Sequence, residues 1–324
     1  MDILIYEHFL GENFDDQLSP LILNEAKLII DNIIKDLSLE FSDSKISLLL
    51  NKKNRNLIHS SSHIYRSFED NIITDISKKI KGNDKVLILA PEENLILFNL
   101  IKSLEDKNIN HFNTNSNFIY NSTNKIELNK KLKKSKKYLV KTYKDYSRVF
   151  MDNGIVAKPN DGIGAKNLFI FKNKLDLEKN KCRLRDFHIF QEYIEGVIIG
   201  INIITKKNKI TILSINEQIY KNSSKNEIYL SMINVGKYNY MLDDFKVFTE
   251  NILSNLNDSF GFIGIDAILT KDKKIMFLEI NPRLTTSYVG LRESIGINPF
   301  SFLQKNIPSF NVAKNKLITL RISK

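Results

Sequence analysis

The first 115 residues of the chain alternate between short, continuous apolar runs and longer segments in which apolar residues recur every three or four positions. Continuous runs of this length predict buried strands, whereas the longer periodic segments predict amphipathic helices. We expect strands at 1–9, 45–51 and 85–91 and helices at 20–38, 66–80 and 94–107. Strands that alternate with helices in this way indicate a parallel sheet covered by helices.

After about residue 120 the pattern changes to strand-like runs separated by short polar turns, which predicts antiparallel strands. We expect these strands within 154–173 and 187–220 and at 260–270 and 274–281, with a helix at 243–258. The predicted fold therefore combines α/β and α+β parts. Its expected units are an N-terminal parallel α/β domain (1–118), a small lid-like unit (119–190) and a larger antiparallel sheet (191–324).

Carboxylates follow two strands of the predicted parallel sheet. Glu7 lies in "EHFLGENFDD", at the carboxyl end of the first predicted strand, and Glu92 and Glu93 follow the third. Ligands approach such sheets at the carboxyl ends of the strands, so these side chains are candidates for contact with a cationic substrate. The alternative is that Glu92 and Glu93 open a helix, where carboxylates interact favourably with the helix dipole.

Polar residues interrupt the last predicted strand pair. Side chains alternate between the faces of a strand, so Glu279, Asn281 and Phe277 should share one face. A two-residue turn at 272–273 would place Asp266 opposite Glu279, with Cβ atoms roughly 5 Å apart. A divalent cation would relieve the repulsion between these carboxylates, and carboxylate and amide oxygens suit Mg²⁺. The alternative is a hairpin whose carboxylates face water.

A second candidate site lies in "KPNDGIGAKN". Lys158 ends a predicted strand, and Gly162 and Gly164 allow a loop to expose its backbone N–H groups to an anion. An ordinary hairpin is the alternative reading of this loop. The segment "QEYIEG" (191–196) ends another strand and could present Glu192 and backbone groups to an adenine edge.

Taken in order, these motifs resemble the ATP-grasp superfamily of carboxylate–amine ligases. They are Lys125, "AKPNDGIGA", "QEYIEG", "GIDAIL" and "FLEINPR", and the resemblance spans about residues 120–295. The N-terminal unit is similar to the usual N-terminal domain of that family. The resemblance implies an architecture in which two subdomains enclose ATP, with Mg²⁺, or alternatively Mn²⁺, as the metal.

The resemblance also implies a role for each matching residue. The residues expected to bind ATP are Lys125, Lys158, Gly162 and Gly164 at the phosphates and Glu192, Tyr193, Ile194 and Glu195 at the adenine. The expected metal ligands are Asp266, Glu279 and Asn281, and the expected catalytic residues are Arg283 and Lys158. Ile198 stands where many relatives carry an acid that holds the ribose, so Glu195 is the alternative ribose contact.

Within the superfamily, "NPRLTTSYVGLR", "KPNDGIGA", "EHFLGE" and "APEEN" are similar to the archaeal tyramine–glutamate ligases of methanofuran biosynthesis. This closer resemblance implies that the γ-carboxylate of L-glutamate forms an acyl phosphate, which tyramine then attacks. Another amino-acid ligase, such as that of the pyrrolysine pathway, and an ATP-grasp small-molecule kinase are the enzymatic alternatives.

Two groups of residues are candidates for substrate contacts. Thr285, Thr286 and Ser287 are candidates to orient the amino acid, although an ordinary polar turn is the alternative for this segment. Glu7 or Glu92 is a candidate to meet the ammonium group of the amine.

Charge adds a non-enzymatic alternative. The net charge is +11, and nine lysines lie within 125–144, with Tyr138 and Tyr143 between them. Such a segment could bind RNA through phosphate contacts and stacking. We favour a solvated helix face followed by a strand, because lysine is frequent throughout the chain, and we expect small-molecule substrates rather than nucleic acid.

Cysteine usage and hydropathy indicate the compartment. A single cysteine, Cys182, excludes an internal disulfide and favours a reducing, cytoplasmic environment. No stretch approaches the roughly 18 continuous apolar residues of a membrane span. The sequence leaves the formation of a homo-oligomer open.

Overall fold

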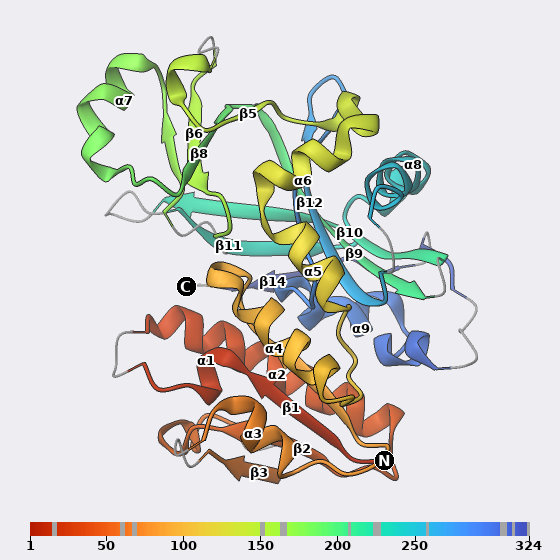
Figure 1. The fold of residues 1–324 in the computed structure, drawn as a ribbon. Helices are drawn as coiled ribbons and strands as arrows, with labels where there is room; N and C mark the ends of the chain where they lie inside the picture. Colours follow the sequence, from red (N-terminus) through yellow and green to blue (C-terminus); the bar gives the residue numbers. More distant parts are fainter. Residues whose placement is uncertain are drawn as a thin grey trace.

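The computed structural model of the chain describes residues 1–14, 18–58, 62–66, 70–149, 153–162, 167–206, 209–222, 228–256, 259–304, 310–312 and 315–322. The strands in these ranges form three sheets (Figure 1). The N-terminal sheet lies at one end of the molecule, the largest sheet crosses the middle, and a small sheet forms a lobe beyond it. This mixed architecture confirms the predicted fold class.

The N-terminal sheet is parallel, with the strand order β3-β2-β1-β4. Its strands are β1 (Ile3–Glu7), β2 (Ile46–Leu50), β3 (Ser62–Tyr65) and β4 (Lys85–Leu89). Its helices are α1 (His8–Gly11), α2 (Pro20–Glu40), α3 (Ile72–Ser77) and α4 (Ile96–Asp106), with short 3-10 turns η1 (Lys52–Asn54) and η2 (Glu93–Leu95). Strands β1 and β2 are wholly buried, as expected for continuous apolar runs in a parallel sheet.

Two elements of this unit differ from the prediction. The edge strand β3 is not predicted, because its polar sequence "SHIY" is half-buried or exposed along its length. Helix α3 is shorter than the predicted helix at 66–80. It begins at Ile72, because the side chain of Asn71 accepts a hydrogen bond from the N–H of Thr74 (2.9 Å) and caps the helix there.

The largest sheet is antiparallel, with the order β13-β12-β9-β10-β11-β14. Its strands are β9 (Gly196–Lys206), β10 (Lys209–Asn222), β11 (Ile228–Val235), β12 (Gly261–Thr270), β13 (Ile275–Asn281) and β14 (Ile318–Arg321). The helices around it are α5 (Ser116–Thr123), α6 (Lys125–Lys131), η3 (Leu132–Tyr138), η6 (Asn239–Met241), α8 (Leu242–Leu253), η7 (Thr286–Gly290), α9 (Leu291–Ile295) and η8 (Pro299–Leu303).

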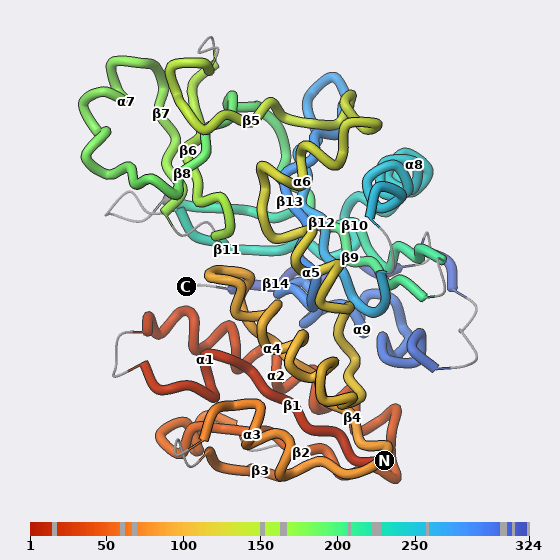
Figure 2. Tube along the Cα trace, in the orientation of Figure 1, coloured from red at the N-terminus to blue at the C-terminus, as the bar shows by residue number. Residues whose placement is uncertain are grey.

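The two faces of the largest sheet bury different cores. On one face, Ile201 and Ile265 pack with Phe118 of α5 and Phe248 of α8. On the other face, strand residues share a core with helix α2 of the N-terminal unit and with the segment from Leu284 to Phe302. The C-terminal part of the chain therefore returns to lie against the N-terminal unit (Figure 2).

The small sheet has the order β5-β8-β6-β7 and is antiparallel. Its elements are β5 (Thr142–Tyr143), η4 (Tyr146–Arg148), β6 (Ile155–Pro159), β7 (Phe169–Phe171), α7 (Lys174–Asn180), η5 (Lys181–Arg183) and β8 (His188–Glu192). We propose that the three units of the chain follow the three sheets. The boundary expected between 190 and 191 falls inside β8, so this strand would belong wholly to the small unit.

The lysine-rich segment forms helix α6, the turn η3 and strand β5, which is the helix followed by a strand that we favoured. Its aromatic residues pack inward. The ring of Tyr138 lies 5.0 Å from that of Phe248, and Tyr143 packs against the core of the small unit. Within the described ranges, no helix is long and apolar enough to cross a membrane.

Candidate active site

The hairpin of β12 and β13 brings the predicted carboxylates together by an unexpected route. The predicted two-residue turn at 272–273 is wrong: the loop has three residues, 271–273, closed by the hydrogen bond from the N–H of Thr270 to the carbonyl of Lys274 (2.9 Å). Lys273 ends this loop with a positive φ of 61°. This is the three-residue hairpin whose last loop residue is left-handed.

A β-bulge restores the predicted register. Ala267 pairs with Phe277, whereas Asp266 pairs with Glu279, so β13 contains one extra residue at this step. The bulge also changes the faces: Phe277 points into the core between the sheet and α8, and Glu279 does not share its face as predicted. Asp266 and Glu279 nevertheless lie directly opposite each other.

Asp266 is held on both sides by amide groups. The side-chain NH₂ of Asn281 donates to one carboxylate oxygen of Asp266 (2.9 Å), and that of Gln218 donates to the other (3.0 Å). The hydroxyl of Tyr220 donates in turn to the amide oxygen of Gln218 (3.0 Å). Burial and the neighbouring charge of Glu279 raise the pKa of Asp266.

Two buried lysines face Glu279. Lys125 is 5% exposed and Lys158 is 7% exposed, which is rare for lysine unless a counter-charge is present. The ammonium of Lys125 lies 3.2 Å from Oε2 of Glu279. Burial alone would raise the pKa of Glu279, but Lys125 and Lys158 outweigh that effect and lower it. Burial lowers the pKa of Lys158 to about 8, against the opposing influence of Glu279 and Asp266.

The glycine loop begins beside these lysines. The ammonium of Lys125 donates to the carbonyl of Gly162 (3.0 Å). A side chain at position 162 would clash with Pro159, because a Cβ there would lie 2.6 Å from the proline ring, so the turn requires glycine. Asp161 accepts a hydrogen bond from the N–H of Asn94 (3.3 Å), which ties the loop to the N-terminal unit. Gly164 lies outside the described residues.

The residues expected at the adenine lie where the small sheet joins the large one. Glu192 ends β8, and the N–H of Tyr193 donates to the carbonyl of Gly154 (3.0 Å). Ile194 is half-buried, and Glu195 is exposed and pairs with Lys271 (2.7 Å). The segment therefore connects the two sheets, and its adenine contacts stay a prediction.

Arg283 reaches from the end of β13 into the N-terminal unit. Its guanidinium contacts the carboxylate of Glu92 through Nη2 (3.1 Å) and Nε (3.0 Å), and Glu92 is buried. Burial alone would lower the pKa of Arg283. The negative charge of Glu92, followed by those of Glu25 and Glu279, outweighs this effect and raises the pKa. Glu92 follows β4, so Arg283 enters the edge where β1 and β4 end, next to Glu7.

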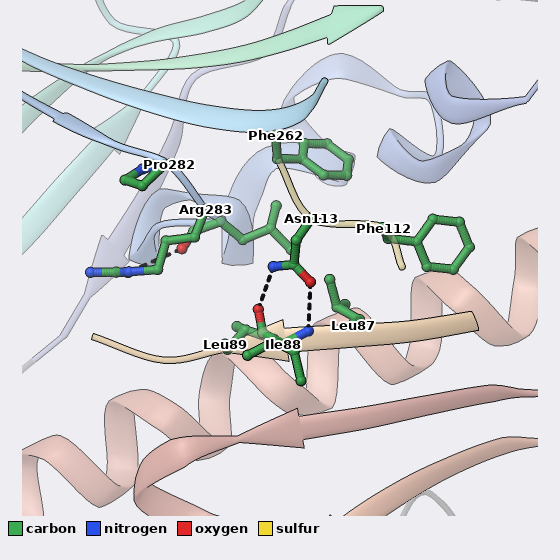
Figure 3. A pocket seen from close by; sticks show the side chains of 9 residues that line it. Leu87, Ile88, Leu89, Phe112, Asn113, Phe262, Pro282 and Arg283 are labelled. Carbon is green, nitrogen blue, oxygen red and sulfur yellow. Dashed lines mark hydrogen bonds between the residues drawn. The ribbon is translucent and has the colours of Figure 1, made fainter. Parts of the chain in front are cut away.

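The segment before α5 positions this contact. The side chain of Asn113 pairs with both backbone groups of Ile88, accepting from the N–H (2.8 Å) and donating to the carbonyl (2.7 Å). The hydroxyl of Thr114 donates to the carbonyl of Pro282 (3.1 Å). Figure 3 shows Asn113 between β4 and Arg283, around a small cavity that Leu89 and Pro282 also line.

The other predicted carboxylates of this edge have local partners. Oε2 of Glu7 accepts a hydrogen bond from the N–H of Leu10 (2.7 Å) and caps helix α1. Burial raises the pKa of Glu7 to about 7. Glu93 begins η2, in agreement with the alternative that it opens a helical turn.

The segment after Arg283 is hydrogen-bonded into the protein. The hydroxyls of Thr285 (3.2 Å) and Ser287 (2.9 Å) both donate to the side-chain oxygen of Asn202, and Ser287 is buried. The hydroxyl of Thr286 donates to the carboxylate of Glu25 on α2. The contact of these three residues with a substrate stays a prediction, and Ser287 is the least accessible of them.

Three residues of the site were not predicted from the sequence. Gln218 and Tyr220 occupy β10 two positions apart, which is the same spacing that identified Glu279 and Asn281. That spacing could have identified them. Glu25 lies in the first turns of α2 and has no distinguishing sequence pattern.

The chemistry of the donor set fits a hard divalent cation. Oxygen atoms of two opposed carboxylates and an adjacent amide are the ligands that Mg²⁺ and Mn²⁺ prefer. Across the described ranges, no group of three or more His, Cys, Asp and Glu side chains offers a different metal site. Asp266, Glu279 and Asn281 are thus the residues that could hold a metal.

Comparison with known proteins identifies proteins that are similar to this chain. A model of the ATP-grasp domain matches residues 122–287. The tyramine–L-glutamate ligase of Methanocaldococcus jannaschii is 31% identical over 297 residues, which cover 90% of this chain and 84% of that protein. The tyramine–L-glutamate ligase of Methanocaldococcus fervens is 28% identical over 317 residues, which cover 90% of this chain and 89% of that protein.

A solved structure has the same fold. An ATP-grasp superfamily protein from Archaeoglobus fulgidus superposes with a TM-score of 0.75 at 18% identity, over 99% of this chain and 92% of the other. The shared fold includes the N-terminal unit, since nearly the whole chain is covered.

Proposed function

This chain belongs to the ATP-grasp superfamily, and from that premise we propose that it joins the γ-carboxylate of L-glutamate to tyramine. An ATP-grasp ligase forms a bond between a carboxylate and an amine and releases ADP and phosphate. The identity of the two substrates is the proposed part. Its support is the similarity to two tyramine–L-glutamate ligases over nine-tenths of the chain.

One observation carries the proposal for the chemistry. The opposed pair Asp266 and Glu279 lies beside two buried lysines, Lys125 and Lys158, and Arg283 leaves the same strand two residues after Asn281. Phosphoryl transfer requires mainly positioning and neutralisation of charge, and this arrangement offers both.

The proposed reaction has two steps. First, an oxygen of the glutamate carboxylate attacks the γ-phosphorus of ATP, the bond to the β-phosphate oxygen breaks, and an acyl phosphate and ADP result. The tyramine nitrogen then attacks the acyl carbon, phosphate leaves, and the nitrogen loses its proton as the amide forms.

The chain's own residues would serve these steps by binding and by neutralising charge. Lys158 and Lys125 would bind phosphate oxygens, and the planar guanidinium of Arg283 would bind the transferred phosphoryl group or the carboxylate with two hydrogen bonds. Asp266, Glu279 and Asn281 would hold Mg²⁺ or Mn²⁺, which when bound neutralises charge on the phosphates.

A coupled assay of ADP release tests the proposal. The purified protein is supplied with ATP, Mg²⁺ and a panel of acids and amines that includes glutamate and tyramine, and the product is identified by mass. We expect ADP release only when both substrates are present, with a product whose mass is that of glutamate plus tyramine minus water. Release of ADP with one acid alone would indicate a kinase, and a different productive pair would indicate another amino-acid ligase.

A matched pair of variants tests the assignment of the site. Glu279→Gln should abolish ADP formation while circular dichroism and thermal unfolding show a folded protein. Glu127→Gln removes an exposed carboxylate on α6 and should retain activity. Normal turnover by Glu279→Gln would refute the metal assignment. RNA affinity that falls with salt and survives Asp266→Asn would instead support the RNA-binding alternative.

A further inference from the structure

Three carboxylates of the N-terminal unit surround the guanidinium of Arg283. Glu92 binds it directly, and Glu7 and Glu25 are close enough to interact with its charge. They come from the end of β1, the segment after β4 and the beginning of α2. The N-terminal unit therefore presents several carboxylates to Arg283.

Two of these carboxylates are committed to protein partners. Glu7 is buried and caps α1 through the N–H of Leu10. Glu92 is buried; its Oε2 accepts a hydrogen bond from Nη2 of Arg283, and its Oε1 lies 3.0 Å from Nε of Arg283 without a hydrogen bond to a described residue. Glu7 or Glu92 would have to lose its present hydrogen bond to turn toward a substrate, and their expected contact with an ammonium group stays a prediction.

Glu25 differs from both. It is half-buried, and its one hydrogen bond to a described residue is the bond that Oε1 accepts from the hydroxyl of Thr286. None of the described cations forms an ion pair with it. Its second oxygen, Oε2, has no hydrogen bond to a described residue.

Glu25 also lies close to the metal face of the site. Burial, followed by the charges of Asp266, Glu279 and Glu25, raises the pKa of Tyr220 well above its usual value. The phenol of Tyr220 is therefore near the metal-binding carboxylates and near Glu25 at the same time. Its hydroxyl is oriented by Gln218, which is itself bonded to Asp266.

We propose that Oε2 of Glu25 binds the protonated primary amino group of a substrate, next to Thr286 and within the range over which the charge of Arg283 acts. This inference rests on the proposed function, and it names the residue that recognises an ammonium group in that reaction. Arg283 and Glu25 offer opposite charges that influence each other, and Thr286, which is bonded to Glu25, follows Arg283 by three residues. Such a pair complements a substrate that carries both a carboxylate and an ammonium group. The ammonium could belong to the amino acid or to the amine.

Glu25→Gln tests the proposal, because glutamine keeps the size of the side chain and the acceptor for Thr286 but removes the charge. We expect the KM for the substrate that carries the bound ammonium to rise about tenfold or more, as expected when one partner of an enclosed charge pair is removed. The KM for ATP should not change. Glu25→Asp retains the charge and should recover most of the affinity.

Glutarate, which is glutamate without its amino group, identifies the source of the ammonium. If Glu25 binds the amino group of glutamate, the wild type should prefer glutamate to glutarate and Glu25→Gln should lose that preference. If Glu25 binds tyramine, the variant should keep the preference and its KM for tyramine should rise. Either result supports the proposal.

Glu40→Gln, at the other end of the same helix, is the matched control. The proposal is overturned if Glu25→Gln changes neither KM more than Glu40→Gln does. Calorimetric binding of glutamate and of tyramine to the ADP-loaded wild type and variant provides a test that needs no turnover. Loss of binding in the variant would support the role of Glu25 even if the wild type failed to form the amide, which would refute only the proposed function.

Discussion

The ammonium of Lys125 lies 3.2 Å from Oε2 of Glu279 and 3.0 Å from the carbonyl oxygen of Gly162. A cation of the protein itself therefore occupies one side of a carboxylate that is expected to bind a metal. The same ammonium holds the start of the glycine loop. Binding of metal and nucleotide should compete with both contacts.

Lys125→Met should therefore tighten binding of Mn²⁺ in the absence of nucleotide, by about tenfold, or roughly 1.4 kcal/mol. The physical reason is that Asp266 and Glu279 would lose a competing positive charge. Electron paramagnetic resonance of free Mn²⁺ measures this affinity directly. Lys130→Met, on the exposed face of the same helix, is the control and should leave the affinity unchanged. Equal or weaker binding by Lys125→Met would contradict this competition.

Gly200→Ala should impair the site with little effect on stability. Gly200 lies in β9 opposite Asp266, and a Cβ there would come within 2.3 Å of the amide nitrogen of Gln218. The amide can move, because it is the end of a flexible side chain, but its bond to Asp266 would be lost. We expect ADP formation to fall about tenfold or more, as for other groups that orient a metal ligand.

Gln218→Ala removes the same hydrogen bond without a steric clash and provides a cross-check. If displacement of Gln218 is the cause, the double variant should be no worse than the more severe single variant. Additive losses of activity, or a large loss of thermal stability in Gly200→Ala alone, would point to damage of the strand instead.

The buried carboxyl of Glu7 should make stability depend on pH. Its pKa is about 7 in the folded protein and about 4.5 as an ordinary glutamate, so between these values the folded state binds more protons than the unfolded state. The free energy of unfolding should therefore fall as the pH rises through this range. Glu7→Gln lacks the titrating group, so at pH 8 its free energy of unfolding should exceed that of the wild type by an amount on the order of 3 kcal/mol.

Urea unfolding of the wild type and of Glu7→Gln at pH 4.5 and at pH 8 measures this difference. The substitution keeps the cap of α1, because the amide oxygen of the introduced glutamine can still accept a hydrogen bond from the N–H of Leu10. If the difference in free energy of unfolding between Glu7→Gln and the wild type is the same at both pH values, Glu7 is not the titrating group.

The sequence predicts that Asp266 lies opposite Glu279, and the structure shows this pair, although it reaches the predicted register only because a bulge offsets a longer loop. The details behind it could not be predicted. The actual hairpin loop is one residue longer than predicted, and a bulge compensates for the difference before the strand reaches Glu279. Neither feature has a marker in "TKDKKIMFLE", since Lys273 is an unusual residue for a left-handed position.

The contacts of Arg283 could not be predicted from the sequence for a different reason. Its partner Glu92 is 191 residues away in the sequence and belongs to another sheet. Strand periodicity predicts which residues share a face, but it contains no information on how two separate units dock. Glu25 was missed for the same reason, because only the approach of Thr286 to α2 reveals its place in the site.

The bulge in β13 separates the two ends of that hairpin. Because the extra residue lies between Phe277 and Glu279, the turn at 271–273 and the pair Asp266–Glu279 do not share a single uninterrupted ladder. We expect a residue gained or lost in the exposed turn to be absorbed at the bulge before it shifts Asp266 against Glu279. A label attached at Asp272, which is exposed, should therefore leave the register of Asp266 and Glu279 unchanged, whereas Lys271 should be kept because it pairs with Glu195.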